Sequence, residues 1–330
     1  MIKNLLATIA LAVFGCLVWA AWFAFSPLRL QTAELDFSIQ PGSSLRSAAR
    51  QISAAGVAMA PWQFALLGRA AGKAGAIKAG SYEIAQGITP WNLLTQITQG
   101  DFSQSEIIFI EGWTFKQIRA VLDAETGLRH DSAKLTDEQI MARIGAPAQA
   151  PEGWFFPDTY LFAKGSSDLA ILKRSWRQME NQLGAAWAQR AQESPLKTPY
   201  EALILASIIE KETGRPDDRP RIGAVFNNRL RIGMLLQTDP TVIYGLGDEF
   251  NGNLKKEHLL RDGPFNTYTR AGLTPHPISM PGSGALLAAV KPAKGDELYF
   301  VARGDGSSQF SKTLLEHNRA VHKYQLSSKR

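Results

Sequence analysis

The stretch that most constrains the fold is residues 200–214, YEALILASIIEKETG, whose middle is apolar in every direction around a helical axis. A helix that is hydrophobic all round is normally a buried one. The segment then turns abruptly charged and reaches Gly214, the residue type that most often follows a helix C-terminus. The sequence therefore predicts a core helix that carries charged side chains at its C-terminal end.

Two glutamates lie in the last turn of this predicted helix. At about 100° per residue, Glu212 lies about 20° around the axis from Glu201, whereas Glu210 lies about 180° from it. Because Glu201 begins the helix, we expect its face, and with it Glu212, to be solvated and Glu210 to point the opposite way. Burial and the negative end of the helix dipole both raise the pKa of a carboxyl group, which keeps it protonated as a proton donor. The alternative is that Glu210 is an ordinary charge on a frayed turn.

Composition places the chain among globular proteins and excludes several kinds of site. The 330 residues are enough for two domains, and 45% of them are hydrophobic. The net charge of +6 permits anionic partners, but no block of Lys and Arg resembles a nucleic-acid arm, so we expect no nucleic-acid partner. Cys16 is the only cysteine and no HExxH pattern occurs, so neither a disulfide nor a metal site is predicted. We expect no cofactor.

The N-terminus predicts a membrane anchor. Residues 5–25 are apolar and uncharged, and about 20 such residues span the hydrocarbon core of a bilayer. Trp19 and Trp22 fall near the end of the segment, where interfacial aromatics are expected. A cleaved signal peptide has a shorter apolar core, and a lipoprotein-type cleavage before Cys16 is disfavoured by the bulky Phe14. We expect an uncleaved single-pass anchor at 5–25, a cytoplasmic tail at 1–4, and the body in the periplasm at the inner membrane.

The remaining chain predicts an α+β fold in two parts. In the small part, 35–102, Leu35, Phe37 and Ile39 alternate as in a strand, and the pattern continues with helices at 45–52, from Pro61 and at 89–97 and a strand at 77–84. The larger part, 106–325, predicts strands at 106–110 and 298–302 and helices after Thr114, at 168–193, 200–213, 221–231 and 285–290, and from Thr313.

Three further segments place polar and aromatic groups on irregular backbone, which commonly lines binding sites. They are LQTDPTVIYGLG at 236–247, FNTY at 265–268 and LTPHPI at 273–278. With an acid at Glu210, they predict a site for a carbohydrate polymer. The alternative is that Asp239-Pro240 and Asn266-Thr267 only make turns. The candidate substrate-binding residues are Gln237, Asp239, Tyr244, Asn266 and Tyr268.

Several segments together resemble one known family. EGWFFPDTY at 152–160, LASIIEKET at 205–213, and the motifs within 226–245 and 266–282 are similar to those of the endolytic murein transglycosylases of the MltG (YceG-like) family. The resemblance covers about residues 106–325, and an anchor followed by a small LysM-like domain, here 35–102, also matches the layout of that family. One departure is His276, where the family usually has glycine in an LPPGPI-like stretch.

The resemblance implies an activity and a role for Glu210. In the family, the first glutamate of the EKET segment is the catalytic acid/base, and it falls on Glu210. The implied reaction cleaves the β-1,4 bond between N-acetylmuramic acid and N-acetylglucosamine within a glycan strand and leaves a 1,6-anhydro end. The implied partners are peptidoglycan and the synthases whose nascent strands the enzyme would terminate. The five candidate binding residues would hold the sugars, with Asp239 orienting its neighbours.

Two other functions stay open at this point. A hydrolase of the muramidase type needs a second carboxylate, for which Asp239 and Glu212 are the candidates by motif. A non-catalytic wall-binding scaffold needs none. Serine acyl transfer is disfavoured because Ser207 precedes Lys211 by four residues and no GxSxG pattern is present.

Overall fold

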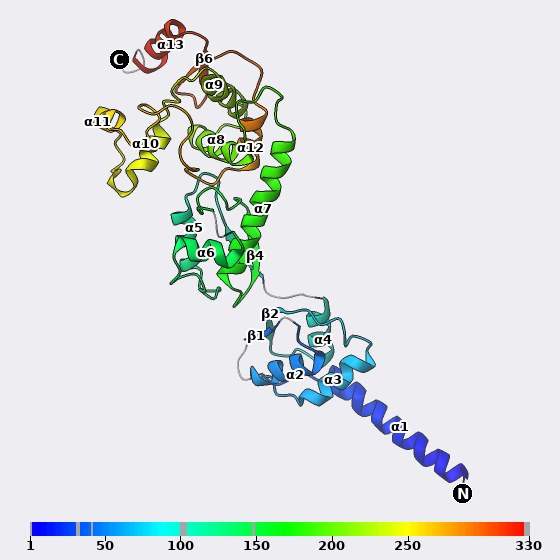
Figure 1. The fold of residues 1–330 in the computed structure, drawn as a ribbon. Coiled ribbons are helices and arrows are strands. Elements are labelled where there is room, and N and C mark those ends of the chain that lie inside the picture. The colour runs from blue at the N-terminus through cyan, green and yellow to red at the C-terminus, as the bar shows by residue number, and fades with distance from the viewer. Residues whose placement is uncertain (1, 31–33, 41, 100–103, 147–148, 327–330) are drawn as a thin grey trace. The chain divides into compact units, whose positions relative to one another are not determined.

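The chain forms two compact units in the computed structural model, which describes residues 2–30, 34–40, 42–99, 104–146 and 149–326 (Figure 1). The first unit holds the residues up to Glu106 together with 127–129 and 161–166, and the second unit holds the rest. Met1 of the predicted tail and the predicted end of the small domain at residue 102 lie outside the described residues.

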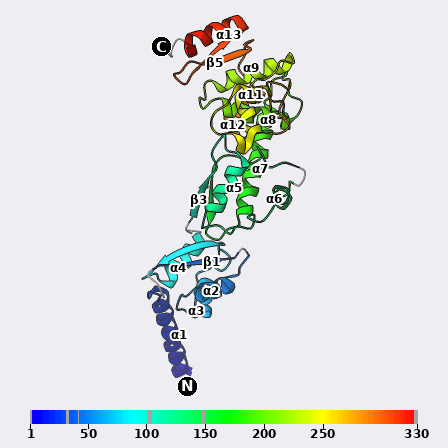
Figure 2. The ribbon, with the colours of Figure 1, turned by 90° about the vertical axis from the view of Figure 1, so that its left-hand side faces the viewer.

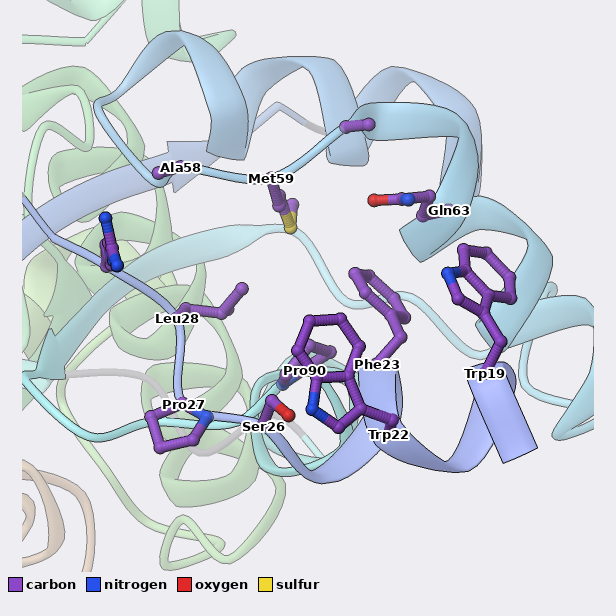
Figure 3. Close-up of a pocket in the computed structure, with 12 residues that line it drawn as sticks. Trp19, Trp22, Phe23, Ser26, Pro27, Leu28, Ala58, Met59, Gln63 and Pro90 are labelled. Atoms are coloured by element: carbon purple, nitrogen blue, oxygen red, sulfur yellow. The ribbon is translucent and has the colours of Figure 1, made fainter. Parts of the chain in front are cut away.

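Helix α1 (Ile2–Phe25) contains the whole predicted apolar segment. No helix in the described part of the chain is both long enough and apolar enough to cross a membrane. The end of α1 meets the small domain through aromatic contacts, because Trp19 stacks on Trp62 with 6.0 Å between ring centroids. Next to these rings is a cavity of about 620 Å³, into which Figure 3 shows Trp22 and Phe23 projecting from α1.

The small domain is built on one strand pair. Strand β1 (Glu34–Ile39) runs antiparallel to β2 (Gly80–Ala85) in a register that pairs Phe37 with Tyr82. Helices α2 (Leu45–Ala54) and α3 (Pro61–Ala70) lie between the two strands in sequence, and α4 (Pro90–Gln99) follows them. Phe37, Ile39 and Tyr82 are buried, so the predicted alternation does place one face in the core. The predicted strand at 77–84 begins later, at Gly80.

The rest of the chain is mainly helical and carries two small two-stranded sheets. Its elements are β3 (Gln104–Ile108), α5 (Phe115–Ala124), α6 (Asp137–Ile144), β4 (Thr159–Ala163), α7 (Asp168–Ala188), α8 (Pro199–Glu212), α9 (Arg219–Arg231), α10 (Asp239–Leu246), η1 (Gly247–Glu249), α11 (Lys256–Leu260), α12 (Ser283–Val290), β5 (Tyr299–Ala302), β6 (Ser308–Ser311), α13 (Leu314–Val321) and η2 (His322–Leu326).

Most of the predicted elements are present, and one segment has a different backbone. The stretch 236–247 was expected to be irregular, with a turn at Pro240, but Asp239–Leu246 forms helix α10. Proline is favoured in the first turn of a helix because its missing N–H would have no intrahelical partner there. Strands β4 and β6 were not predicted from the sequence.

Helix α8 is the centre of the larger unit. All nine residues from Ala202 to Glu210 are buried, and α8 packs against α7, α9, α10 and α12. Figures 1 and 2 show α9 and α12 beside α8 from two directions. Helices α9 and α12 approach closely because position 223 is glycine, where a Cβ atom would lie 2.3 Å from the carbonyl oxygen of Ala288.

The loop before α12 is tied to α8 by hydrogen bonds. The Ser207 hydroxyl accepts a hydrogen bond from the backbone N–H of Ile278 at 3.0 Å, and the Ser279 hydroxyl donates to the carbonyl of Ser207 at 3.0 Å. Both serine side chains are buried. These bonds hold the segment that leads to Gly282 against the C-terminal half of α8, where Glu210 lies.

Candidate active site

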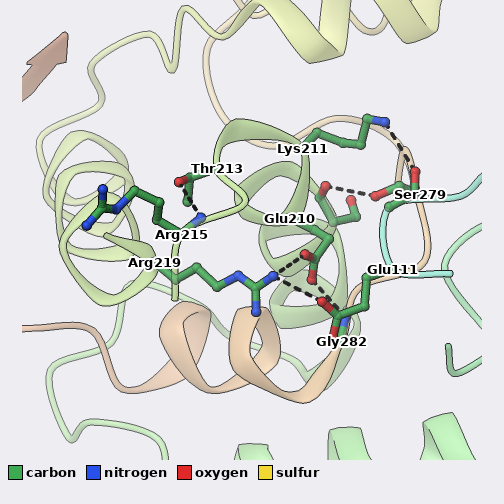
Figure 4. Close-up of polar contacts among 10 residues, drawn as sticks. Glu111, Glu210, Lys211, Thr213, Arg215, Arg219, Ser279 and Gly282 are labelled. Carbon is green, nitrogen blue, oxygen red and sulfur yellow. Dashed lines mark hydrogen bonds and ion pairs between the residues drawn. The ribbon is translucent and has the colours of Figure 1, made fainter. Parts of the chain in front are cut away.

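Glu210 lies in the last turn of α8 and is held at both of its oxygens. Only 3% of its side chain is exposed, and Oε1 accepts a hydrogen bond from Nη2 of Arg219 at 2.8 Å. Oε2 accepts one from the backbone N–H of Gly282 at 2.9 Å. The same Arg219 nitrogen donates to Glu111 at 3.0 Å (Figure 4). Two distant segments, at Arg219 and Gly282, therefore hold this carboxyl group, and a third, at Glu111, shares Arg219 with it.

The predicted burial of Glu210 is thus confirmed, and so is the direction of its pKa. Burial raises the pKa of Glu210, and this effect outweighs the lowering by the Gly282 N–H and by the positive charge of Arg219. The negative charge of Glu111 adds to the rise. Such a carboxyl group can hold a proton closer to neutral pH than an exposed glutamate and can donate it to a bound molecule.

Glycines make room for the side chains around Glu210. A Cβ atom at Gly282 would lie 1.9 Å from Oε1 of Glu111, and one at Gly284 would lie 2.8 Å from Nη1 of Arg219. Both positions therefore permit the contacts between Glu111, Arg219 and Glu210. Sequence reasoning missed Glu111 and Arg219, and the Gly-x-Gly spacing at 282–284 was the one local signal that side chains approach the backbone there.

Glu212 is not fully solvated, contrary to the prediction from helix phase. Its side chain is partly buried and accepts a hydrogen bond from the Thr238 hydroxyl. Burial raises the pKa of Glu212 to about 7, with Thr238 opposing the rise and the charge of Asp239 adding to it. The reason is tertiary, because the segment around Thr238, distant in sequence, covers this side of the last turn of α8.

Four of the five predicted binding residues, all except Tyr244, belong to the segments on the Glu212 side of the helix. Tyr268 donates its hydroxyl hydrogen bond to Asp239 at 2.5 Å, and the negative charge of Glu212 helps to raise the pKa of Tyr268, after burial and Asp239. Gln237 is exposed and has φ 49°, the one positive φ at a non-glycine position in the described part of the chain. Residues held in this sparsely populated region cluster at functional sites.

Asn266 has a structural task in this cluster. Its side-chain amide donates to the carbonyls of Leu259 and Arg261 at 3.0 and 2.7 Å, and its oxygen accepts from the N–H of Tyr268 at 2.8 Å. The side chain is buried. Asn266 therefore fixes the loop that presents Tyr268, and its predicted contact with sugar stays a prediction.

Tyr244 belongs to a third group of residues. Its hydroxyl donates to Oε2 of the buried Glu152 at 3.1 Å, and the same two residues line a cavity of about 680 Å³. His276, the departure noted in the sequence, lies in that cavity too. The structure thus divides the candidates into the Glu210 centre, the Glu212 cluster and the Glu152 cavity. Within the described residues there is no group of three or more His, Cys, Asp or Glu side chains that could hold a metal ion.

The fold and site define an α+β protein with a small N-terminal domain and a buried, arginine-paired glutamate at the end of a core helix. The model of the YceG-like family matches residues 37–323, and the chain belongs to this family. It is 32% identical to an endolytic murein transglycosylase of Bacillus subtilis (strain 168) over 312 residues, which cover 89% of this chain and 86% of the relative.

More distant relatives agree with this assignment. An endolytic murein transglycosylase of Streptococcus pneumoniae serotype 2 is 26% identical over 280 residues, which cover 74% of this chain and 50% of that relative. A 2.6 Å crystal structure of a yceG-like protein from Listeria monocytogenes superposes with a TM-score of 0.55 at 28% identity, over 87% of this chain and 98% of that one.

Proposed function

We propose that the protein is an endolytic murein transglycosylase that cleaves the glycan strands of peptidoglycan, with Glu210 as its catalytic acid/base. Two curated relatives carry that activity in their names, and the B. subtilis one matches most of this chain. The observation that carries the proposal is the burial of the Glu210 side chain at the end of α8, which raises its pKa although Arg219 and the N–H of Gly282 oppose the rise.

One carboxyl group suffices for the proposed reaction. Glu210 donates its proton to the oxygen of the β-1,4 bond between N-acetylmuramic acid and N-acetylglucosamine, and the bond to the leaving sugar breaks. The resulting carboxylate then takes the proton of the 6-hydroxyl of the muramoyl residue while that oxygen closes onto C1. The product is a 1,6-anhydro end, no water is consumed, and Glu210 is protonated again.

The test is digestion of purified peptidoglycan by the full chain and by Glu210→Gln, with product masses read by mass spectrometry. Glu210→Gln keeps the size of the side chain and removes the transferable proton, so we expect loss of cleavage by at least about 100-fold. Glu193→Gln is the matched control, because Glu193 is exposed on a separate turn. Full cleavage by Glu210→Gln would refute the assignment, and products lacking the anhydro mass would refute the reaction.

A second candidate reaction is hydrolysis of the same bond. The observation that favours it is the Glu212 carboxyl, whose pKa is raised to about 7 by burial and which lies beside Asp239. A hydrolase needs a second carboxyl group as nucleophile or base. Products with reducing ends that disappear in Glu212→Gln would favour hydrolysis over the lytic reaction.

We further propose that residues 5–25 anchor the protein in the inner membrane, with residues 1–4 in the cytoplasm and the body in the periplasm beside peptidoglycan synthases. We also propose that the small domain is LysM-like and binds glycan, which its strand–helix–helix–strand order supports. Cell fractionation of the full chain and of a chain lacking residues 1–25 tests the anchor. Equal recovery of both in the soluble fraction would contradict it.

A further inference from the structure

The cavity beside Glu152 is separate from the Glu210 centre and has the dimensions of a ligand site. Its volume of about 680 Å³ lies within the range of about 300–1,000 Å³ that is usual for small-molecule pockets. Helix α5 supplies one wall with Phe115, Lys116 and Arg119, and Glu152, Tyr244 and His276 come from three other segments.

Glu152 gives this cavity an acceptor that is only partly used. It is 7% exposed, and its two oxygens accept one hydrogen bond each, from the N–H of Phe115 at 3.1 Å and from the Tyr244 hydroxyl at 3.1 Å. An ionised carboxylate offers about four acceptor positions. The backbone N–H of Gly153 also acts on this carboxylate. About one position therefore stays available for a donor that enters the cavity, and a positively charged donor makes the strongest such bond.

Aromatic rings add a second feature that favours a cation. Tyr244 and His276 line the cavity and meet edge to face at 5.7 Å, and Phe265 packs against both at 5.1 and 4.7 Å. The faces of aromatic rings attract ammonium groups, with a free energy of about 0.5–2 kcal/mol depending on desolvation. A carboxylate in a cavity lined by aromatic rings is a favourable environment for a primary ammonium group.

The remaining lining residues carry charges of both signs. Arg119 pairs with Asp137 at 2.8 Å, Lys116 is mostly exposed, and Asp123 adds a further carboxylate. In a ligand that combines an ammonium group with carboxylates, the ammonium group could pair with the lining carboxylates and the carboxylates with Lys116 or Arg119. Sugars of the glycan backbone carry no ammonium group, whereas the short peptides attached to them combine acidic groups with the amine of a diamino acid.

The cavity lies within reach of the Glu210 centre. Residues 111–115 connect Glu111, which shares Arg219 with Glu210, to Phe115, whose N–H binds Glu152. An extended chain covers at most about 3.6 Å per residue, so these two positions are at most about 14 Å apart. A peptide of four residues attached to a sugar at Glu210 has a similar extended reach.

We propose that this cavity is a subsite for the stem peptide of peptidoglycan, in which Glu152 and Tyr244 bind the free ammonium group of the diamino acid. This inference rests on the proposed function, because it takes murein as the substrate. It adds that the enzyme recognises the peptide as well as the glycan.

The test compares three substrates: glycan strands with free-amine peptides, the same strands with the amines acetylated, and strands from which an amidase has removed the peptides. For the full chain we expect a KM for free-amine strands about tenfold below that for the other two, equivalent to about 1.4 kcal/mol. Glu152→Gln, which can still accept from Phe115 and pair with Tyr244, should raise the KM for free-amine strands to the common value and leave the others unchanged.

Two further measurements keep the outcome decisive. Tyr244→Phe retains the ring, so its KM for free-amine strands should rise less than that of Glu152→Gln. The exposed control Glu193→Gln should have the KM values of the unmodified chain. Equal KM values of the full chain on all three substrates would overturn the subsite, as would an equal loss on all three in Glu152→Gln. If the full chain cleaves none of them, the proposed function fails, and the subsite is then judged by calorimetry. Free stem tetrapeptide should bind the full chain more tightly than the acetylated peptide, and equal binding would refute the subsite.

Discussion

Replacing Arg219 by glutamine should move the high-pH limb of activity to higher pH. In the proposed mechanism Glu210 must be protonated when substrate binds, so kcat/KM falls as Glu210 loses its proton in the free enzyme. Arg219 holds the ionised form through a hydrogen bond of 2.8 Å to Oε1 and its positive charge. Without that charge, the pKa of Glu210 rises further, and activity persists to a higher pH.

The size of the shift follows from the geometry of the pair. An opposite charge within hydrogen-bond distance lowers the pKa of a carboxyl group by about 1–3 units, and one unit corresponds to about 1.4 kcal/mol. The side chains of Arg219 and Glu210 are only 13% and 3% exposed, so solvent screens the pair weakly. We therefore expect the limb to move up by about 1–3 pH units, while the bond from Gly282 to Oε2 stays in place.

The assay is kcat/KM on purified glycan strands as a function of pH for the unmodified chain and three variants. Arg219→Lys keeps the positive charge, so its high-pH limb should lie close to that of the unmodified chain. Arg221→Gln is the control, because Arg221 pairs with Glu297 and is about half exposed. A limb that stays in place or moves to lower pH in Arg219→Gln would refute the reasoning, since Arg219 would then not act on the proton of Glu210.

Three further outcomes follow from the structure. Burial raises the pKa of Glu152 to about 7 in the folded chain. Protonated Glu152 therefore contributes about 3 kcal/mol to the free energy of unfolding below about pH 4.5, and this contribution is lost as pH rises through about 7. In denaturant titrations, Glu152→Gln should lose less unfolding free energy over that pH range than the unmodified chain. Gly282→Ala should displace Glu111 and reduce glycan cleavage, whereas Gly184→Ala, on the exposed side of α7, should raise the unfolding free energy by about 0.5–1 kcal/mol. Gly223→Ala should lower the melting temperature with a cost of about 1–3 kcal/mol, because its Cβ would meet the backbone of Ala288.

The sequence was sufficient to predict the core helix from its local apolar pattern, and the burial of Glu210 from its position opposite to Glu201 around the helix. A helix that is apolar all round leaves no solvated face except at its ends, and this holds whatever packs against it. The strand pair of the small domain was predictable for the same reason, from the alternation around Phe37.

What the sequence did not predict depends on contacts between distant segments. Glu212 was expected in solvent because helix phase describes only one helix, and it cannot show that Thr238 covers that face. The partnership of Arg219 with Glu111 joins residues separated by 108 positions. Helix α10 was missed because a proline after an aspartate is compatible with both a turn and a helix start, and packing against α8 decides between them.

The way in which Arg219 is shared bears on how Glu210 can take up a proton. Oε2 accepts from a backbone N–H, which an ionised and a neutral carboxyl group can both do, so this bond need not change. Oε1 accepts from Arg219, and a proton on Oε1 would face that N–H donor. Because the same Arg219 nitrogen also donates to Glu111, the guanidinium keeps an anionic partner when Glu210 is neutral. Glu111 thereby lowers the free-energy cost of releasing Oε1 from Arg219 when Glu210 takes up a proton, as the proposed mechanism requires.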